Sequence, residues 1–299
     1  MTTVTAPATD ALVARTVDRR GESRMRRRRR LVFVADHSVG IAVAVAFLAP
    51  FVFITLQAFM TSQQALTSDL WPQSWHPENF VEVFSKAPMW LYLRNTLVYA
   101  GLATVFMLLS SIPAAYALSR LQWRWRNVAF VVVLMMMMLP PQVTQVPIYV
   151  MWTKLHLTGT LWPMILPNLL GDAFSIFLLR QFFLTIPQEY ADAARVDGCS
   201  EWRVMTKVIL PMAKPGIAAT AMFMFFFCWN DFYGPILYTS ENPDNWTISL
   251  GLASFRNLYQ VQWNLTMAAT LLAMLPVLLV FFFAQKVFVE GITLTGVKG

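Results

Sequence analysis

Six long apolar windows dominate the pattern of hydrophobic and polar residues. They cover about residues 39–60, 95–118, 128–150, 161–184, 216–238 and 265–288. A transmembrane helix needs about 20 mostly apolar residues to cross about 30 Å of hydrocarbon. The pattern therefore predicts an all-α membrane protein with six transmembrane helices. The first window is too long for the apolar part of a signal peptide and five more follow it, so we expect it to stay as an anchor.

The fourth window is the one most interrupted by helix-breaking and polar residues. It contains Pro163, Pro167, Asn168, Gly171 and Asp172. Irregular backbone at membrane depth is tolerated where it is buried in protein or lines a water-filled cavity. We therefore expect this helix to line a solute pathway, with Asn168 and Asp172 as candidate pathway residues. For Asp172, a hydrogen bond to a neighbouring helix or to a broken backbone turn is the alternative.

Two further polar residues, Asn230 and Asp231, fall near the end of the fifth window. Their side chains suit contact with the hydroxyl groups of a solute, and we treat them as candidate pathway residues. Capping of the helix and contact with a partner subunit are the alternatives.

Composition supports lipid as the main solvent of this chain. Apolar residue types make up 57% and charged types 13%, about half the roughly 25% of soluble proteins. The net charge of +7 could indicate nucleic-acid binding, but nine of the 23 basic residues precede residue 31. Such a cluster before an apolar window is typical of a cytoplasmic anchor beside anionic lipid. We expect residues 1–30 to form a disordered basic tail and residues 31–299 one membrane domain, with no nucleic-acid partner.

The distribution of lysine and arginine predicts the orientation. With the N-terminus in the cytoplasm, 19 basic residues fall on the inner side and four on the outer side. Cytoplasmic loops carry the excess of lysine and arginine in membrane proteins. We therefore expect both termini to be cytoplasmic in a multi-pass membrane protein.

Several kinds of chemistry find no support in the sequence. It contains no phosphate-binding Gly-x-x-x-x-Gly-Lys-Ser/Thr loop, and its two cysteines and three histidines are far apart. We therefore expect that this chain does not hydrolyse ATP itself and holds no metal site.

The segment from Pro187 to Pro211, between the fourth and fifth windows, predicts two short helices joined by a sharp turn. Pro187 suits a first helical turn, and Gly198 can adopt positive φ and end the first helix. Ser200 can cap the second helix, which we expect to end at Leu210–Pro211. An exposed hairpin rich in small residues is typical of a surface that binds another protein.

The residues of this loop resemble the "EAA" signature of permeases from binding-protein-dependent ABC importers. The signature reads Glu-Ala-Ala, three residues, Gly, nine residues and Ile-x-Leu-Pro. Here Asp192-Ala193-Ala194, Gly198 and Val208-Ile209-Leu210-Pro211 match its spacing, with Asp192 in place of Glu and Val208 in place of Ile. Further motifs, among them Asn95-Thr96-Leu97 and Trp229-Asn230-Asp231-Phe232, extend the resemblance to the sugar-importer branch, and within it to the second permease subunit of maltose-type transporters.

The resemblance implies a division of labour among several chains at the bacterial plasma membrane, in which this chain is not an enzyme and binds no cofactor itself. A second permease would enclose the pathway, two ATP-binding subunits would bind and hydrolyse ATP with Mg, and an extracytoplasmic solute-binding protein would deliver a sugar or sugar-like solute. It also implies an ATPase-contacting tail at Lys298 and Gly299. The expected ATPase-coupling residues are Glu189, Asp192, Ala193, Ala194, Asp197, Gly198, Val208, Leu210 and Pro211.

Two other classes of protein compete with this interpretation. A secondary transporter driven by an ion gradient usually shows inverted repeats and membrane-embedded ionisable residues, whereas here Asp172 is the sole mid-window carboxylate and no repeat is evident. A structural scaffold without transport activity is the other alternative. Purification with an ATPase and a second permease would separate the three classes.

Overall fold

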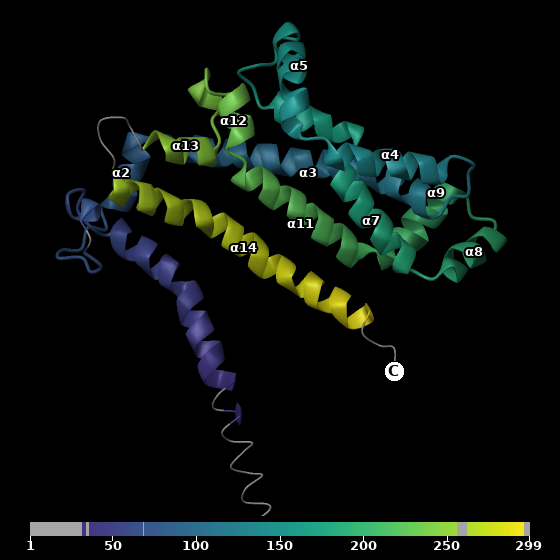
Figure 1. The fold of residues 1–299 in the computed structure, drawn as a ribbon, viewed down its shortest axis with the longest axis horizontal. Coiled ribbons are helices and arrows are strands. Elements are labelled where there is room, and N and C mark those ends of the chain that lie inside the picture. The colour runs from purple at the N-terminus through teal and green to yellow at the C-terminus, as the bar shows by residue number, and fades with distance from the viewer. Residues whose placement is uncertain (1–31, 34–35, 68, 256–261, 296–299) are drawn as a thin grey trace, which may run out of the picture. The chain divides into compact units, whose positions relative to one another are not determined.

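A computed structural model describes residues 32–33, 36–67, 69–255 and 262–295, which contain helices and no β-strand. The chain divides into two units, Met1–Leu56 and Gln57–Gly299. The expected basic tail and the expected ATPase-contacting residues Lys298 and Gly299 lie outside the described residues. The all-α fold expected from the apolar windows is confirmed (Figure 1).

In the first unit, the described residues form essentially one helix. This helix runs over Asp36–Ala58 and ends two residues inside the second unit; its mean hydropathy is 2.6, and none of its most apolar stretch is buried. A helix that is apolar all round and uncovered by its own chain needs lipid or another protein around it. It corresponds to the first expected window, 39–60.

The second unit is a bundle of helices around three long ones, α3, α11 and α14. Its first half contains η1 (Gln64–Leu66), α2 (Asn79–Lys86), α3 (Met89–Ser119), α4 (Arg126–Met138), α5 (Pro141–Lys154), α6 (Trp162–Ile165), η2 (Leu166–Leu170) and α7 (Ala173–Thr185). Its second half contains α8 (Gln188–Val196), α9 (Glu201–Arg203), η3 (Val204–Ile209), α10 (Leu210–Met212), α11 (Lys214–Asn230), α12 (Tyr233–Tyr238), η4 (Pro243–Asn245), α13 (Ile248–Ser254) and α14 (Trp263–Thr295). Helix α3 packs against α7 and α11, and α11 packs against α14 (Figure 1).

Among the described residues, four helices are long and apolar enough to cross a membrane: Asp36–Ala58, Met89–Ser119, Trp162–Thr185 and Trp263–Phe283. Two bent pairs, 126–154 and 201–230, bring the total to six if each pair is one span. The expected windows thus correspond to helices, although two of them are not the single helices that we expected.

The expected helix 128–150 is broken at two consecutive prolines. Helix α4 ends at Met138, and the chain turns by 91° before the next helix. A residue that precedes proline is pushed out of the helical region, and here both Leu139 (ψ 119°) and Pro140 (ψ 130°) precede one. Two extended residues in a row end the helix and redirect the chain.

The expected helix 216–238 is also two helices. Helix α11 ends at Asn230 and α12 begins at Tyr233. Asp231 separates them with extended backbone (ψ 118°), and its Oδ1 accepts a hydrogen bond from the Gly234 N–H at 3.0 Å. A side chain that binds the backbone locally competes with the helical hydrogen bonds, so the helix restarts after Asp231.

The fourth window is interrupted where its sequence indicated. A 3₁₀ segment, η2, ends at Gly171, whose φ of +95° only glycine adopts without strain. Helix α7 then begins after Asp172, whose Oδ2 accepts a hydrogen bond from the Ser175 N–H at 2.7 Å.

Helices α7 and α11 approach each other closely at Gly216. A Cβ atom on Gly216 would lie 2.4 Å from Cγ of Phe182, at the root of that ring rather than at a flexible end. The two helices can therefore pack at this distance only with glycine at the position.

We expect Gly216→Ala to lower the stability of the protein by about 1–3 kcal/mol, because overpacking forces helices apart. Gly101→Ala is the matched control, since no atom lies within 4 Å of the added Cβ in the middle of α3. That control should be neutral or slightly stabilising. Thermal unfolding of the detergent-purified variants measures both, and equal melting temperatures would contradict the packing argument.

Candidate functional site

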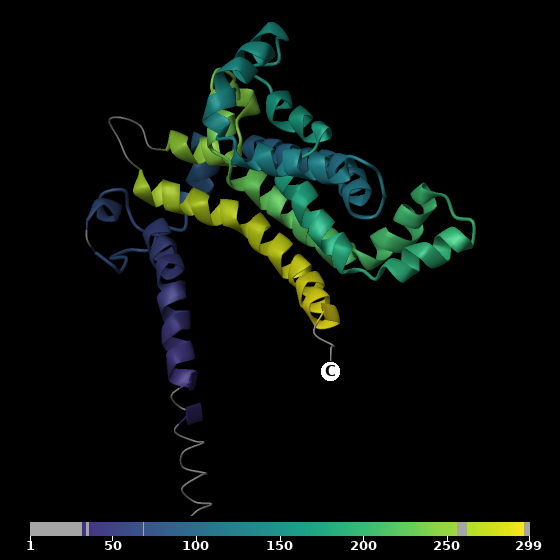
Figure 2. The ribbon, with the colours of Figure 1, turned by 45° about the vertical axis from the view of Figure 1, so that its right-hand side comes forward.

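The 187–211 loop forms a helical hairpin beyond the ends of α7 and α11 (Figure 2). Helix α8 ends at Val196, and Gly198 takes a φ of +79°, as its position in the sequence predicted. The N–H groups of Asp197 and Cys199 bind the carbonyls of Ala193 and Ala194, both at 3.0 Å. These hydrogen bonds close the end of the helix and fix the turn.

The second helix of the hairpin differs from the expectation in two respects. Ser200 precedes α9, but its side chain makes no capping hydrogen bond. The helix also continues past Leu210–Pro211 to Met212, through a π-helical turn at Val204–Ile209. Proline at position 211 is tolerated because it lies in the first turn of the α-helical segment that follows the π turn.

The inner face of the hairpin is apolar and packed against α3 and α7. The buried residues of this cluster are Ala115, Tyr116, Leu179, Phe183, Ile186, Ala191, Val204, Met205, Ile209 and Ala213. Ala191 is completely buried, which explains why a small residue is needed there. The hairpin is therefore continuous with the hydrophobic core of the helix bundle.

Arg195 joins the two helices of the hairpin. Its Nε and Nη2 bind the two carboxylate oxygens of Glu201 at 2.7 and 3.2 Å, and its Nη1 binds Asp192 Oδ1 at 2.7 Å. The hydrogen bond to Glu201 is the main reason why the pKa of Arg195 is raised above its ordinary value. Tyr116 of α3 donates to the same Glu201 at 2.6 Å. This network ties the hairpin to a long apolar helix.

Arg120, directly after α3, holds the start of the hairpin. Its guanidinium donates to the carbonyls of Phe183 and Ile186, and its Nη1 donates to Gln188 Oε1 at 2.7 Å. Burial lowers the pKa of Arg120 below its ordinary value. The last carbonyls of a helix lack hydrogen-bond donors within the helix. At the end of α7, the Arg120 guanidinium is such a donor.

The outer face of α8 is exposed in the described part of the chain. Glu189, Tyr190, Ala193, Val196 and Asp197 follow helical spacing and are all exposed, and this face is opposite the buried Ala191. Val196 is 88% exposed, and Trp202 of the next helix is 66% exposed. Exposed apolar residues bordered by carboxylates are typical of a surface that binds another protein.

Among the other expected coupling residues, Asp192 and Gly198 are exposed, and Ala194, Val208 and Leu210 are half-buried. Pro211 is exposed. The expected residues thus divide into a free face of α8 and a set that holds the hairpin on the bundle.

Two of the four candidate pathway residues lie together. Asn168 and Asp172 line a cavity of about 420 Å³, with walls formed by Phe174, Ser175, Phe223, Met224 and Phe227. Asp172 also caps α7, which is the structural alternative considered above. Ser110 and Ser111 of α3 bind the Asn168 carbonyl and the Asp172 N–H, at 2.7 and 3.3 Å.

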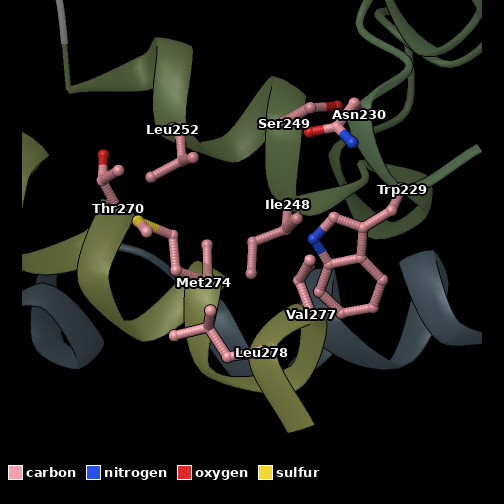
Figure 3. Close-up of a pocket in the computed structure, with 10 residues that line it drawn as sticks. Trp229, Asn230, Ile248, Ser249, Leu252, Thr270, Met274, Val277 and Leu278 are labelled. Carbon is pink, nitrogen blue, oxygen red and sulfur yellow. The ribbon is translucent and has the colours of Figure 1, made fainter. Parts of the chain in front are cut away.

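The other two candidates lie elsewhere. Asn230 lines a separate pocket of about 230 Å³ between α11, α13 and α14, with Trp229 and Ser249 beside it (Figure 3). Asp231 is structural: its Oδ2 accepts from the Tyr99 hydroxyl at 2.9 Å, and its carbonyl accepts from Ser249 Oγ at 2.6 Å. The structure therefore does not bring all four residues into one site.

The opposite end of α3 positions the segment between α12 and α13. Asn95, which is 2% exposed, donates to the carbonyls of Asp244 and Trp246 at 2.7 and 3.0 Å. Thr96 accepts a hydrogen bond from the Ile248 N–H at 2.8 Å. The same segment is also bound to the loop before α6, where the side chains of Asn242 and Asn245 both donate to the Gly159 carbonyl, at 3.1 and 2.8 Å. This segment is thus held at two points.

Sequence reasoning missed the residues that hold these elements: Tyr99, Tyr116, Arg120, Arg195 and Glu201. The i, i+3 spacing of Asp192 and Arg195 could have indicated their ion pair. Tyr116 and Glu201 are 85 residues apart, so nothing local in the sequence could have connected them.

Apolar helices long enough to cross a membrane, a cavity with apolar walls at a helix break and an exposed hairpin are typical of a membrane transport subunit. The chain belongs to the family described as binding-protein-dependent transport system inner membrane component, whose model matches residues 107–294. The resemblance that the loop motif indicated is confirmed.

The chain is similar to named permeases over nearly its whole length. It is 30% identical to the arabinooligosaccharides transport system permease protein AraQ of Halalkalibacterium halodurans, over 88% of this chain and 95% of that protein. It is 28% identical to the diacetylchitobiose uptake system permease protein NgcG of Streptomyces coelicolor, over 84% of each. A crystal structure of a bacterial ABC transporter that imports alginate has the same fold, with a TM-score of 0.74, 20% identity and coverage of 86% of this chain and 96% of that chain.

We expect Glu201→Gln to loosen α8, because it weakens the bidentate pair with Arg195. Partly exposed pairs of this kind contribute about 0.2–1 kcal/mol, so amide exchange in α8 should rise by up to about fivefold. Arg203→Gln is the control, since Arg203 is exposed and makes no ion pair within the described residues. Hydrogen exchange measured by mass spectrometry tests this, and equal exchange in the two variants would argue against the role of the pair.

Proposed function

We propose that this chain is a permease subunit of an ABC importer that moves a sugar or sugar-like solute into the cytoplasm. It would pair with a second permease, and two partner ATPase subunits would bind the 187–211 loop and drive transport with ATP and Mg. An extracytoplasmic solute-binding protein would deliver the solute. The expected contact of Lys298 and Gly299 with an ATPase is part of this proposal.

The observation that carries the proposal is the division of the 187–211 hairpin into a fixed and a free face. The fixed face is part of the bundle core and is tied to α3 through Tyr116 and Glu201. The free face presents Tyr190, Ala193 and Val196 to solvent. A protein that binds the free face and moves would pull on the ends of α3 and α7, because the hairpin is packed on both.

A sugar or sugar-like solute is supported by the relatives and by the cavity at the break before α7. The printed names of relatives include an arabinooligosaccharide and a diacetylchitobiose system. The cavity combines an amide and a carboxylate with three phenylalanine side chains. Polar groups for hydroxyls beside apolar walls are a common arrangement of small-molecule sites.

The segment between α12 and α13 is the part that we propose to face the solute-binding protein. On the predicted topology it is external, and its turn carries the exposed carboxylates Glu241 and Asp244. Because Asn95 binds its backbone and Gly159 accepts from the Asn245 side chain, its surface is preformed. Binding to a preformed surface avoids the cost of ordering a loop.

We expect Gly198→Val and Ala193→Asp each to abolish transport and weaken recovery of the ATPase. At Gly198, φ of +79° costs a residue with a Cβ about 1–2 kcal/mol. At Ala193, an added carboxylate would be buried without a partner in the proposed contact with the ATPase, which would weaken binding by about 1–3 kcal/mol. Co-purification of the ATPase and sugar uptake in vesicles measure the two effects.

The controls for these variants are Gly101→Ala and Ser85→Asp. Gly101 has open space around it, and Ser85 is an exposed residue of α2, on the side predicted to be external. Both should transport and retain the ATPase. Normal uptake and ATPase recovery with Gly198→Val and Ala193→Asp would rule out the proposed role of the hairpin.

We expect the double variant Glu241→Lys/Asp244→Lys to reduce stimulation of ATPase activity by the solute-binding protein several-fold. Assembly and unstimulated activity should be unchanged, because both side chains are exposed and the backbone contacts remain. Asp69→Lys changes another exposed carboxylate and is the control. If the double variant and the control respond equally to the binding protein, this segment does not form the contact.

A further inference from the structure

The connection between α3 and α4 carries a motif to which the proposed function gives no role. Its sequence is Trp123-Arg124-Trp125-Arg126. The two tryptophans are 42% and 58% exposed, and the Arg124 guanidinium lies 5.2 Å from the ring centre of Trp125. Arg124 is exposed and Arg126 is half-buried. Large aromatic rings and free cations therefore alternate at this end of the bundle.

A third arginine, Arg180 of α7, lies against the same two helices. Its guanidinium covers the ring of Phe130 of α4, with Cζ 3.8 Å from the ring centre, and its Nε donates to the Leu118 carbonyl of α3 at 3.1 Å. Arg126 donates to the Leu121 carbonyl at 3.3 Å, and the positive charges of Arg126 and Arg180 repel each other. Arg126 and Arg180 thus place two positive charges where α3, α4 and α7 meet.

The described part of the chain provides no anion for these three guanidinium groups. None of them forms an ion pair there. The sequence has no Asp or Glu between Glu82 and Asp172, and none between Asp172 and Glu189. Asp172 caps the end of α7 that is farther from Arg180. An anion that binds these guanidinium groups would therefore come from outside α3, α4 and α7.

We propose that Arg124, Arg126 and Arg180 bind the phosphate of an anionic phospholipid, with Trp123 and Trp125 at the level of the headgroups. Guanidinium groups bind phosphate through paired hydrogen bonds. Tryptophan is enriched at the membrane–water interface, and basic pockets between transmembrane helices bind anionic headgroups. Helix α4 has no buried residue, so the surface next to the motif is available to lipid. A binding surface for an acidic protein would not need two exposed indole rings beside an uncovered apolar helix.

The test uses the full-length protein in its purified assembly, reconstituted in vesicles of phosphatidylcholine with about a quarter phosphatidylglycerol. Electron paramagnetic resonance of spin-labelled lipids measures the association of each lipid with the protein. We expect wild-type protein to prefer phosphatidylglycerol, and the preference to fall by about fivefold for each arginine removed. Arg124→Gln/Arg126→Gln is the main variant, and it leaves Arg180 and its contacts in place.

Two controls separate a specific site from general charge. Lys154→Gln removes one exposed cation at the far end of α5 and should keep the preference, and Arg124→Lys/Arg126→Lys should keep most of it because the charge remains. An unchanged preference in the double glutamine variant would overturn the proposal, and so would an equal loss in Lys154→Gln. Loss of the ATPase with the lipid preference unchanged would instead identify an acidic protein surface as the partner. The lipid measurement does not depend on transport, so it stands apart from the proposed function.

Discussion

Polar groups inside an apolar bundle must find partners within the protein, and in this chain α3 provides several of them. At one end Tyr116 binds Glu201 and so fixes the hairpin, and at the other end Asn95 and Thr96 bind the segment before α13. Unpaired polar groups are costly where water is absent. The hairpin and the segment between α12 and α13 are therefore both tied to one helix by hydrogen bonds.

This arrangement connects the two ends of the molecule mechanically. A hydrogen-bonded helix of 31 residues is stiff along its axis, and each of its ends is attached to an exposed element. Movement of the hairpin would therefore be accompanied by movement of α3, and through Asn95 by movement of the segment between α12 and α13. Proteins switch through such rigid displacements of packed helices rather than by gradual deformation.

The sequence was sufficient for the fold class because lipid imposes a simple requirement of length and apolar character. It was sufficient for the turn at Gly198 because positive φ depends on one residue. The sequence wrongly predicted 128–150 and 216–238 as single helices. The first is broken because the residues that precede Pro140 and Pro141 are extended. The second is broken because the Asp231 side chain accepts a hydrogen bond from the Gly234 N–H. The sequence also could not identify the Tyr116–Glu201 pair, because only the tertiary fold brings these residues together.

The interruption before α7 places a cavity next to backbone groups that need hydrogen-bond partners from another helix. Breaking this helix frees the Asn168 carbonyl and the Asp172 N–H, which lipid cannot satisfy. Ser110 and Ser111, consecutive residues of α3, bind these two groups, and a proline, Pro113, follows inside the same helix. The cavity with Asn168 and Asp172 thus lies beside a helix break whose backbone groups are bound by two hydroxyl groups of α3. Because a hydroxyl can exchange one hydrogen-bond partner for another, this contact can adjust with little cost while the rest of the bundle stays packed.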